Sequence, residues 1–270
     1  MGKLQALIFD VDGTLADTER DGHRIAFNAA FSDAGLDWHW SEDCYGDLLQ
    51  VTGGKERIAR YIDRHCPGFV VPDGQTRADF IARLHQAKTG HYVQLLGQGH
   101  VPLRCGVLRL LREARAAGIR LAIATTTTPE NVTALLDNQC EPGLREWFEV
   151  IAAGDVVPRK KPAPDIFMRV LEQLELEPAD CAVIEDSDHG AAAALGAGLE
   201  TLIVTLSHYT RNQDFGRAAL VVDQLGEPDA PEEIRGGVLA GALTTAATAS
   251  VCVDLALIKR LHQMLWKRFD

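Results

Sequence analysis

ALIFDVDGTLADTE (Ala6–Glu19) is the stretch of sequence that decides the fold. In it, four apolar residues lead directly into two acids, Asp10 and Asp12, which stand two positions apart. Asp and Gly are ordinary in a solvated turn, so a strand that simply ends at the surface is one interpretation. The other is an acid pair at the carboxyl end of a buried strand, where open α/β sheets bind their ligands. The rest of the chain decides between the two.

Several further apolar runs resemble the first, and polar residues accompany them. They are LAIA (Leu121–Ala124), FEVIAAGD (Phe148–Asp155), CAVI (Cys181–Ile184) and TLIV (Thr201–Val204). Runs of this length are typical of strands that are buried on both faces of a parallel sheet. Stretches with helical periodicity lie between them, such as GVLRLLREARAAG (residues 106–118). The alternation predicts an α/β fold with a doubly wound, Rossmann-like parallel sheet.

A long insertion separates the first strand from the others. Residues 17–97 are polar and amphipathic, with a helical pattern throughout, as in HRIAFNAAFSDAGL (residues 23–36). They predict an all-helical cap domain that emerges just after the acid pair and closes over a site there. The α/β core is then expected over residues 1–16 and 98–230, and residues 231–270 form a C-terminal extension that ends in a helix.

The composition is that of an ordinary soluble globular protein. With a formal net charge of -11, the 270-residue chain is not expected to bind nucleic acid or an anionic membrane broadly. The uncharged stretch at residues 236–253 is rich in small residues, which favours a linker into a packed helix over a membrane span. Six scattered cysteines without a CxxC pair indicate buried free thiols in a reducing compartment. No signal or transit peptide is recognised, so the expected location is the cytoplasm, or the plastid stroma in a eukaryote.

Polar groups that suit phosphate chemistry follow four of the predicted strands. They are Asp10 and Asp12 after the first, Thr125 to Thr128 after the second, Lys161 after the third, and Glu185 and Asp186 after the fourth. The ends of parallel strands lie along one edge of a sheet, so we expect these groups to form one site. They supply a nucleophilic carboxylate, a second carboxylate for proton transfer, hydroxyl and ammonium groups for a phosphate, and acids for a hard cation such as Mg²⁺.

These four motifs, in this order, resemble the haloacid dehalogenase superfamily of phosphohydrolases. The resemblance covers residues 6–223, and the insertion corresponds to that family's helical cap. It implies that Asp10 attacks phosphorus and becomes an aspartyl-phosphate. It implies also that Asp12 protonates the leaving oxygen and then activates water.

The same resemblance implies the ligands of the phosphate and of the cofactor. Thr125 and Lys161 would bind the phosphoryl oxygens, with Thr126 and Thr127 beside them. Mg²⁺ would be held by Asp10, the backbone carbonyl of Asp12, and Asp186, with Glu185 nearby.

FDVDGTLADTE, TGGKERI (Thr52–Ile58), ATTTTPENV and KKPAPDIF are similar to the CbbY-type branch of this superfamily. By that resemblance the substrate is xylulose-1,5-bisphosphate, an inhibitor of Rubisco in the Calvin cycle, and the product is xylulose 5-phosphate. The substrate-selecting pocket would consist of Asp17, Gly53, Gly54, Lys55, Glu56 and Arg57. Bare backbone amides and cations favour a second phosphate, although a helix start with solvated charges would also explain residues 53–57.

Two features depart from the pattern of the branch. Asp17 stands where we expect a glutamate, one methylene longer, at the entrance to the cap. One extra residue lies between Glu19 and His23, and the inserted segment includes Gly22. The insertion changes the register of the first cap helix and leaves the role of His23 open.

Functions from different classes compete at this point. A Mg²⁺-dependent sugar-phosphate phosphatase that acts as a monomer on a small sugar bisphosphate leads. A phosphosugar mutase of the β-phosphoglucomutase type shares all four motifs, and release of inorganic phosphate distinguishes the two. A non-catalytic binding module would require loss of a catalytic group, but Asp10, Asp12, Lys161 and Asp186 are all present.

Overall fold

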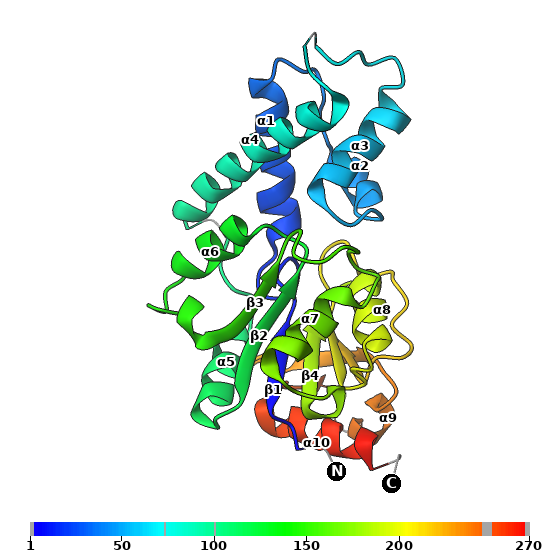
Figure 1. Cartoon of the computed structure of the whole chain (residues 1–270). Helices are drawn as coiled ribbons and strands as arrows, with labels where there is room; N and C mark the ends of the chain where they lie inside the picture. Colours follow the sequence, from blue (N-terminus) through cyan, green and yellow to red (C-terminus); the bar gives the residue numbers. More distant parts are fainter. Residues whose placement is uncertain (1–2, 73, 100, 245–249, 268–270) are drawn as a thin grey trace.

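The computed structural model describes residues 3–72, 74–99, 101–244 and 250–267 as an α/β core with a helical cap above it (Figure 1). The described strands form one sheet in the order β3-β2-β1-β4-β5-β6-β7-β8. They are β1 (Ala6–Phe9), β2 (Arg120–Thr125), β3 (Phe148–Ala153), β4 (Cys181–Glu185), β5 (Leu202–Thr205), β6 (Leu220–Val222), β7 (Glu232–Gly236) and β8 (Ser250–Val251). Strands β1 to β6 pair in parallel, and β7 and β8 pair antiparallel. The predicted α/β fold is confirmed.

The strand order places the ligand-binding edge beside β1. The chain proceeds from β1 to β2 and β3 on one side, and then crosses to β4, β5 and β6 on the other. Phe9, the last residue of β1, is in register with Ile123 of β2 and Ile184 of β4. The carboxyl ends of these three strands therefore lie within two residues of one another along the sheet. The topological switch point between β1 and β4 is where such sheets bind ligands.

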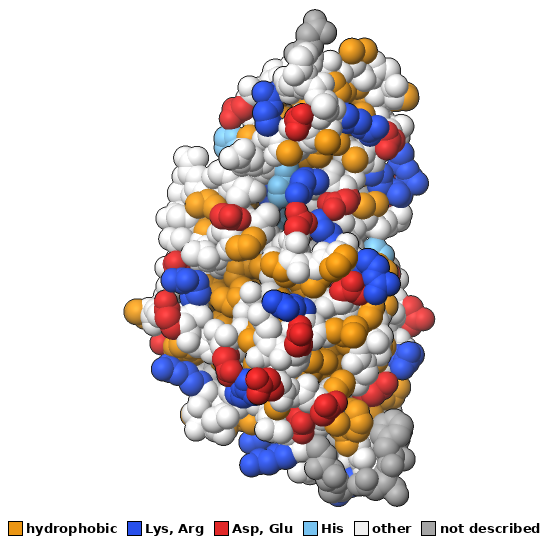
Figure 2. Space-filling model, viewed as in Figure 1, with side chains coloured by type: hydrophobic (Ala, Val, Ile, Leu, Met, Phe, Trp, Pro, Cys, Tyr) orange, Lys and Arg blue, Asp and Glu red, His pale blue; other side chains and the backbone are white. Residues whose placement is uncertain are grey.

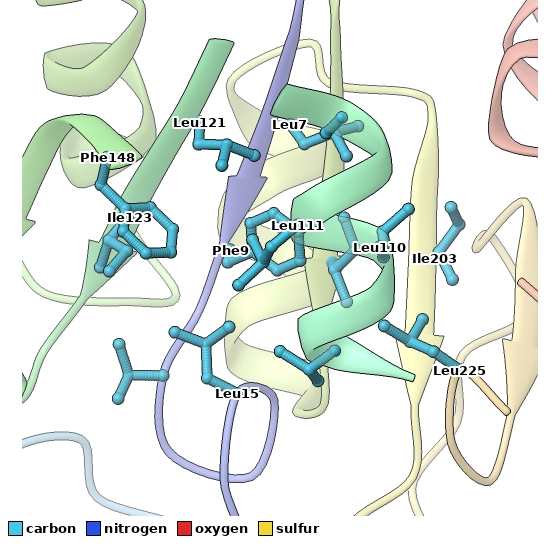
Figure 3. Packing of buried hydrophobic residues seen from close by; sticks show 14 of the residues in the cluster. Leu7, Phe9, Leu15, Leu110, Leu111, Leu121, Ile123, Phe148, Ile203 and Leu225 are labelled. Carbon is cyan, nitrogen blue, oxygen red and sulfur yellow. The ribbon is translucent and has the colours of Figure 1, made fainter. Parts of the chain in front are cut away.

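Helices cover both faces of the sheet, and β1 is buried between them. On one face lie α5 (Val107–Ala116), α6 (Pro129–Asp137) and α10 (Leu255–Trp266), and on the other α7 (Asp165–Leu174) and α8 (Asp188–Gly196). Side chains alternate along a strand, so Leu7 and Phe9 pack with Leu110 and Leu111 of α5 (Figure 3). Ala6 and Ile8 face the α7 and α8 side. Burial on both faces holds the carboxyl end of β1 rigidly.

The cap stands over the carboxyl ends of the strands (Figure 1). Its elements are η1 (Glu19–His23), α1 (Arg24–Asp33), α2 (Glu42–Leu48), α3 (Gly54–His65) and α4 (Arg77–Gly97), and no described residue from 17 to 97 belongs to the sheet. Aromatic side chains form its own core, with Trp38, Trp40 and Tyr45 buried around Phe27 and Phe31. The cap thus has an aromatic core of its own, while Ala26, Tyr92 and Leu96 belong to the cluster that packs on the sheet.

The sheet continues past residue 230, into the segment that we expected to be a C-terminal extension (residues 231–270). β7 adds to the edge of β6, and β8 adds to β7. The last helix, α10, buries Ile258 and Leu261 in the same cluster as Leu7. Residues 245–249 of the small-residue stretch lie outside the described residues, and no helix among the described ones is long and apolar enough to cross a bilayer.

The cysteines are free thiols, but they are less buried than the sequence predicts. All six are unpaired, and burial is complete only for Cys181. Cys140 is exposed and the other four are partly buried. Disulfides therefore play no part in holding this fold together.

Candidate active site

A cavity of about 250 Å³ lies between the cap and the carboxyl edge of the sheet. It brings together most of the site residues that the sequence predicts. These are Asp10, Asp12, Gly53, Gly54, Arg57, Thr125, Thr126, Thr127, Lys161, Glu185 and Asp186. Residues far apart in the chain thus converge on one cavity, as the strand order predicts for those that follow the strands.

The centre of the site is a buried ammonium between two carboxylates. Lys161 Nζ donates to Asp10 Oδ1 at 2.6 Å and to Glu185 Oε1 at 2.6 Å, and to the Ala124 carbonyl at 2.9 Å. Its side chain is 4% exposed. Burial lowers the pKa of Lys161, but the two carboxylates outweigh that effect and raise it, so the side chain stays charged. Lys161 therefore holds Asp10 and offers a fixed positive charge beside it.

Asp186 completes an acidic cluster that can hold a hard cation. Ligand oxygens of Asp10, Glu185 and Asp186 lie within 4.8 Å of one another, and all three residues are buried. Burial raises the pKa of Asp10 to about 8, with Lys161 opposing and Glu185 adding to the rise. Burial, together with the carboxylates of Glu185 and Asp10, raises the pKa of Asp186 well above its usual range. A site with this excess of buried acid fits a divalent cation, because carboxylate oxygens are hard ligands.

Glu185 acts on Lys161 more than on a cation. Its Oε2 accepts hydrogen bonds from the backbone amides of Asp186 and Ser187, at 2.8 and 3.0 Å, and from the Ser187 hydroxyl at 3.1 Å. Its Oε1 accepts from Lys161. Both oxygens are therefore occupied, although the residue lies within the acidic cluster.

The turn after the acid pair leaves room for Asp186 only because residue 13 is glycine. Gly13 has a φ of +91°, and a Cβ there would collide with the Asp186 carboxylate. Its carbonyl accepts a hydrogen bond from Arg104, whose guanidinium also donates to the carbonyls of Leu206 at 2.7 Å and Asp223 at 2.8 Å. Arg104 thereby fastens the turn to the carboxyl ends of β5 and β6.

The end of β2 forms a hydroxyl-lined corner of the cavity. Thr125 Oγ1 accepts from the Thr127 amide at 3.3 Å, and Asn131 donates to Thr127 Oγ1 at 2.9 Å. Helix α6 begins directly behind, at Pro129. Hydroxyls and a helix N-terminus together favour an anion, so this corner suits phosphoryl oxygens.

Asp12 is held by residues of the cap rather than of the core. Its Oδ1 accepts from Thr18 Oγ1 at 2.5 Å and lies 2.9 Å from His23 Nε2. The other ring nitrogen of His23 lies 2.7 Å from Lys88 Nζ, on α4. Burial raises the pKa of Asp12, but His23, Thr18 and Lys88 outweigh it and hold the pKa below its usual range. The orientation of Asp12 therefore depends on the position of the cap.

The extra residue before His23 forms a π-helical turn. Residues Glu19–His23 make the π-helix η1, which widens the backbone by one residue and then continues as α1. Gly22 packs against Tyr92, where a Cβ would lie 2.8 Å from the ring. The bulge absorbs the insertion, so that Glu19 and His23 both line the cavity.

The cap wall presents Arg57, braced by groups around it. Arg57 donates to Tyr45 Oη at 3.1 Å, to the Val51 carbonyl at 3.0 Å and to Glu19 Oε1 at 3.4 Å, and Tyr45 donates to the other Glu19 oxygen. The Arg57 side chain is 12% exposed. Gly53 and Gly54 line the cavity next to it. These cap residues line the same cavity as the acidic cluster.

Three of the predicted substrate residues lie outside the cavity. Asp17 faces Arg104, with its Oδ1 3.4 Å from Arg104 Nε, and its side chain is 59% exposed. Lys55 and Glu56 point away from the cavity, toward the core. Lys55 pairs with Asp155, and Glu56 pairs with Lys160. The acid that lines the cavity at the cap entrance is Glu19.

Sequence reasoning missed some cavity residues. Lys88 and His85 come from α4, in a segment that we interpreted only as helical, and Tyr209 comes from the loop after β5. A buried lysine on an amphipathic helix carries a signal, because Lys88 stands among apolar residues on that face of α4. For Tyr209 no pattern in the chain gives one.

Comparison with known proteins agrees with this geometry. The family profile of haloacid dehalogenase-like hydrolases matches residues 4–198. The protein CbbY of Rhodobacter capsulatus is 50% identical over 216 residues, which are 80% of this chain and 91% of that protein. A crystal structure of a CbbY variant from Rhodobacter sphaeroides in complex with xylulose-(1,5)bisphosphate is 45% identical with a TM-score of 0.75, over 82% of this chain and 94% of that one. A putative β-phosphoglucomutase from Thermotoga maritima is 27% identical with a TM-score of 0.55, over 75% of this chain and 86% of that one.

Proposed function

The chain belongs to the haloacid dehalogenase-like hydrolases and is a phosphatase of that family, and from this premise we propose that it hydrolyses xylulose-1,5-bisphosphate to xylulose 5-phosphate and inorganic phosphate. One observation carries the proposal. The same cavity holds Asp10 and Lys161 from the core and Arg57 from the cap. A substrate with a phosphate at each end matches cations at both ends of this cavity.

Asp10 is the proposed nucleophile. Its carboxylate forms a bond to phosphorus as the bond from phosphorus to the sugar oxygen breaks, and water then attacks phosphorus and regenerates the carboxylate. Lys161 Nζ lies 2.6 Å from Asp10 Oδ1, so a phosphoryl group that reaches Asp10 also reaches the ammonium. Thr125 and Thr127 supply hydroxyls to the other phosphoryl oxygens. These fixed donors stabilise the charge that develops in transfer.

Asp12 is the proposed acid and base. Thr18 and His23 both contact Oδ1, which leaves Oδ2 for the leaving oxygen of the sugar. The Asp12 carboxylate, which is ionised in the free enzyme, takes up a proton as the substrate binds, gives it to that oxygen in the first step and removes a proton from water in the second. Because the cap supplies Thr18 and His23, opening of the cap removes the groups that orient Asp12.

Mg²⁺ is the proposed cofactor. Asp10, Asp186 and the backbone carbonyl of Asp12 would hold it, because a hard cation prefers oxygen ligands. When bound it screens the repulsion between the carboxylate and the phosphate. Glu185, whose oxygens are both occupied, is assigned to orient Lys161.

Arg57, Gly53 and Gly54 are the proposed partners of the second phosphate. Glu19 and Tyr45 hold the Arg57 guanidinium in one orientation, and a planar fork in that position suits two phosphate oxygens. Binding energy from this remote end helps to orient the reacting phosphate. We further propose a monomer in the cytoplasm without a nucleic-acid or membrane partner. Figure 2 shows acidic and basic side chains interspersed on the face that it draws.

A phosphoglucomutase-type isomerisation is the second candidate, favoured by the likeness to the Thermotoga maritima protein. Incubation with Mg²⁺ and either xylulose-1,5-bisphosphate or a sugar monophosphate distinguishes the two. We expect one phosphate released per bisphosphate, and a kcat/KM at least about 10-fold above that for the monophosphates. Interconversion of sugar phosphates without net phosphate release would identify a mutase.

A further inference from the structure

Four charged side chains of alternating sign join the cap to the core outside the cavity. Lys55 Nζ lies 2.6 Å from Asp155 Oδ2, and Lys160 Nζ lies 3.0 Å from Asp155 Oδ1 and 2.7 Å from Glu56 Oε1. Lys55 and Glu56 belong to the first turn of α3 in the cap. Asp155 and Lys160 belong to the core loop between β3 and α7. Two of the three contacts therefore cross the boundary between the domains.

The four side chains Lys55, Asp155, Lys160 and Glu56, joined in that order, are called the charge ring below. They lie directly behind residues that line the cavity. A Cβ on Gly53 would lie 2.7 Å from Lys160 Nζ and would collide with the Glu56 carboxylate, so the ring packs against the Gly53 backbone. The Lys160 side chain is 17% exposed, and hydrogen bonds from Lys55 and Lys160 lower the pKa of Asp155 to about 2. The next residue after Lys160 is Lys161, which contacts Asp10. The ring thus connects the turn at Gly53–Arg57 to the loop that carries Lys161.

We propose that Asp155 and Lys160 are positioning residues, which hold the Gly53–Arg57 turn of the cap at a fixed distance from Asp10 so that the two phosphates of one substrate are bound together. The predicted change in kinetics rests on the proposed bisphosphate substrate. The predicted attachment of the cap to the core does not. Lys55 then serves the reaction through the core rather than through contact with substrate. Separation of the ring lets the cap wall move away from Lys161, and Asp12 loses its cap partners at the same time.

Charge inversion in each domain separately gives the sharpest test. The cap variant is Lys55→Glu with Glu56→Lys, and the core variant is Asp155→Lys with Lys160→Glu. Each variant keeps the net charge of the protein. Each also keeps the attraction between positions 155 and 160, which both belong to the core. Both contacts between the domains, however, become repulsions in each variant. The four-fold variant that combines them restores every attraction. The control is Arg169→Glu with Glu172→Arg, an exposed ion pair at 3.1 Å that lies within the core on α7.

Two readouts are measured for each variant. Hydrogen–deuterium exchange of peptides that cover residues 50–60 and 154–162 reports separation of the domains without any substrate. The values of kcat and KM for xylulose-1,5-bisphosphate report its consequence. We expect faster exchange and a roughly 10-fold loss of kcat/KM in the cap and core variants, since two partly exposed pairs change from attraction to repulsion. We expect exchange and kcat/KM within about threefold of the parent in the four-fold variant and in the control.

Three outcomes overturn the proposal. Unchanged exchange in the cap and core variants means that the ring does not hold the domains together. Exchange in the four-fold variant as fast as in the two others means that the substitutions cause local damage irrespective of charge sign. Restored exchange with no change in bisphosphate kinetics in any variant overturns the role in positioning substrate. An absence of bisphosphate hydrolysis by the parent enzyme instead refutes the proposed function, and the exchange data still decide the structural claim.

Discussion

Binding of Mg²⁺ should release protons from the acidic cluster and should stabilise the protein more at pH 8 than at pH 5. The reason lies in the raised pKa of Asp10, about 8 in place of 3.8, which burial causes and the neighbouring acids increase. At pH 7 such a carboxyl is about 90% protonated in the metal-free protein, by the ordinary titration relation. A cation bound between Asp10 and Asp186 favours the charged forms, so the protons leave.

The sign and size of the effect on stability follow from the same values. Between pH 3.8 and about 8 the metal-free folded protein retains a proton on Asp10 that the unfolded chain has lost, so its stability falls as pH rises. The slope is about 1.4 kcal/mol per pH unit for one proton, which gives a ceiling of roughly 6 kcal/mol at pH 8. Mg²⁺ offsets part of this cost, by about 2.7 kcal/mol at a concentration of a hundred times its apparent dissociation constant at that pH.

Calorimetry and thermal unfolding measure both quantities. Titration of Mg²⁺ at pH 7, in two buffers of different ionisation enthalpy, should give about one released proton or more per ion, and fewer at pH 9. The gain in Tm with Mg²⁺ should be larger at pH 8 than at pH 5. The variant Asp10→Asn, which has no proton to release at that position, serves as the control. No proton release, together with a gain in Tm that does not depend on pH, would refute the assignment of a cation to this cluster.

Three other predictions concern single residues. Arg57→Ala should lower kcat/KM for the bisphosphate by roughly 10- to 150-fold, the equivalent of a lost charge-assisted contact of about 1.5–3 kcal/mol. The loss for p-nitrophenyl phosphate should be much smaller. Equal losses on the two substrates would make Arg57 a structural residue. Gly13→Ala should reduce turnover by about 100-fold or more, because its Cβ collides with the Asp186 carboxylate, and a folded variant that keeps a tenth of the parent rate would contradict this. At pH 8, peptide mapping after iodoacetamide should find Cys140 modified and Cys181 intact, since burial raises the Cys181 pKa to about 12; equal labelling of the two would show that the core opens readily.

The first five strands of the sheet could be predicted because each is a short apolar run with a polar residue at its end. β6 has three residues and β8 has two, too few for any periodicity. β7 has the sequence EEIRG and is partly exposed, and a stretch with so many charged residues is typical of a loop. These strands form by successive pairing, β6 on the edge of β5, β7 on β6 and β8 on β7, rather than through local preference, and only the folded sheet provides those edges.

The catalytic groups could be predicted, but the direction of the cap residues could not. Asp10, Lys161 and Asp186 follow strands, and parallel strands fix on which edge such residues lie. Lys55 and Arg57 are two positions apart at the start of one helix, so they point in different directions, one to the core loop and one into the cavity. Which of them meets the cavity depends on how the cap sits on the core, and that depends on contacts between distant segments.

The insertion before His23 shows a similar limit. The extra residue is visible in the sequence, but not the way in which the chain accommodates it. A π-helical turn keeps His23 against Asp12, whereas a continuous α-helix through the insertion would rotate His23 by about 100°. Packing of Gly22 on Tyr92 is consistent with the first solution.

Capture of the covalent intermediate tests the central claim most directly. In the variant Asp12→Ala, p-nitrophenyl phosphate can still phosphorylate the enzyme, because nitrophenolate leaves without an acid, while hydrolysis of the adduct lacks its base. Rapid acid quench followed by peptide mass mapping should then find one phosphoryl group on Asp10 in the peptide that contains residues 6–19. Turnover without any adduct on Asp10, or with the phosphoryl group on another residue, would contradict the mechanism.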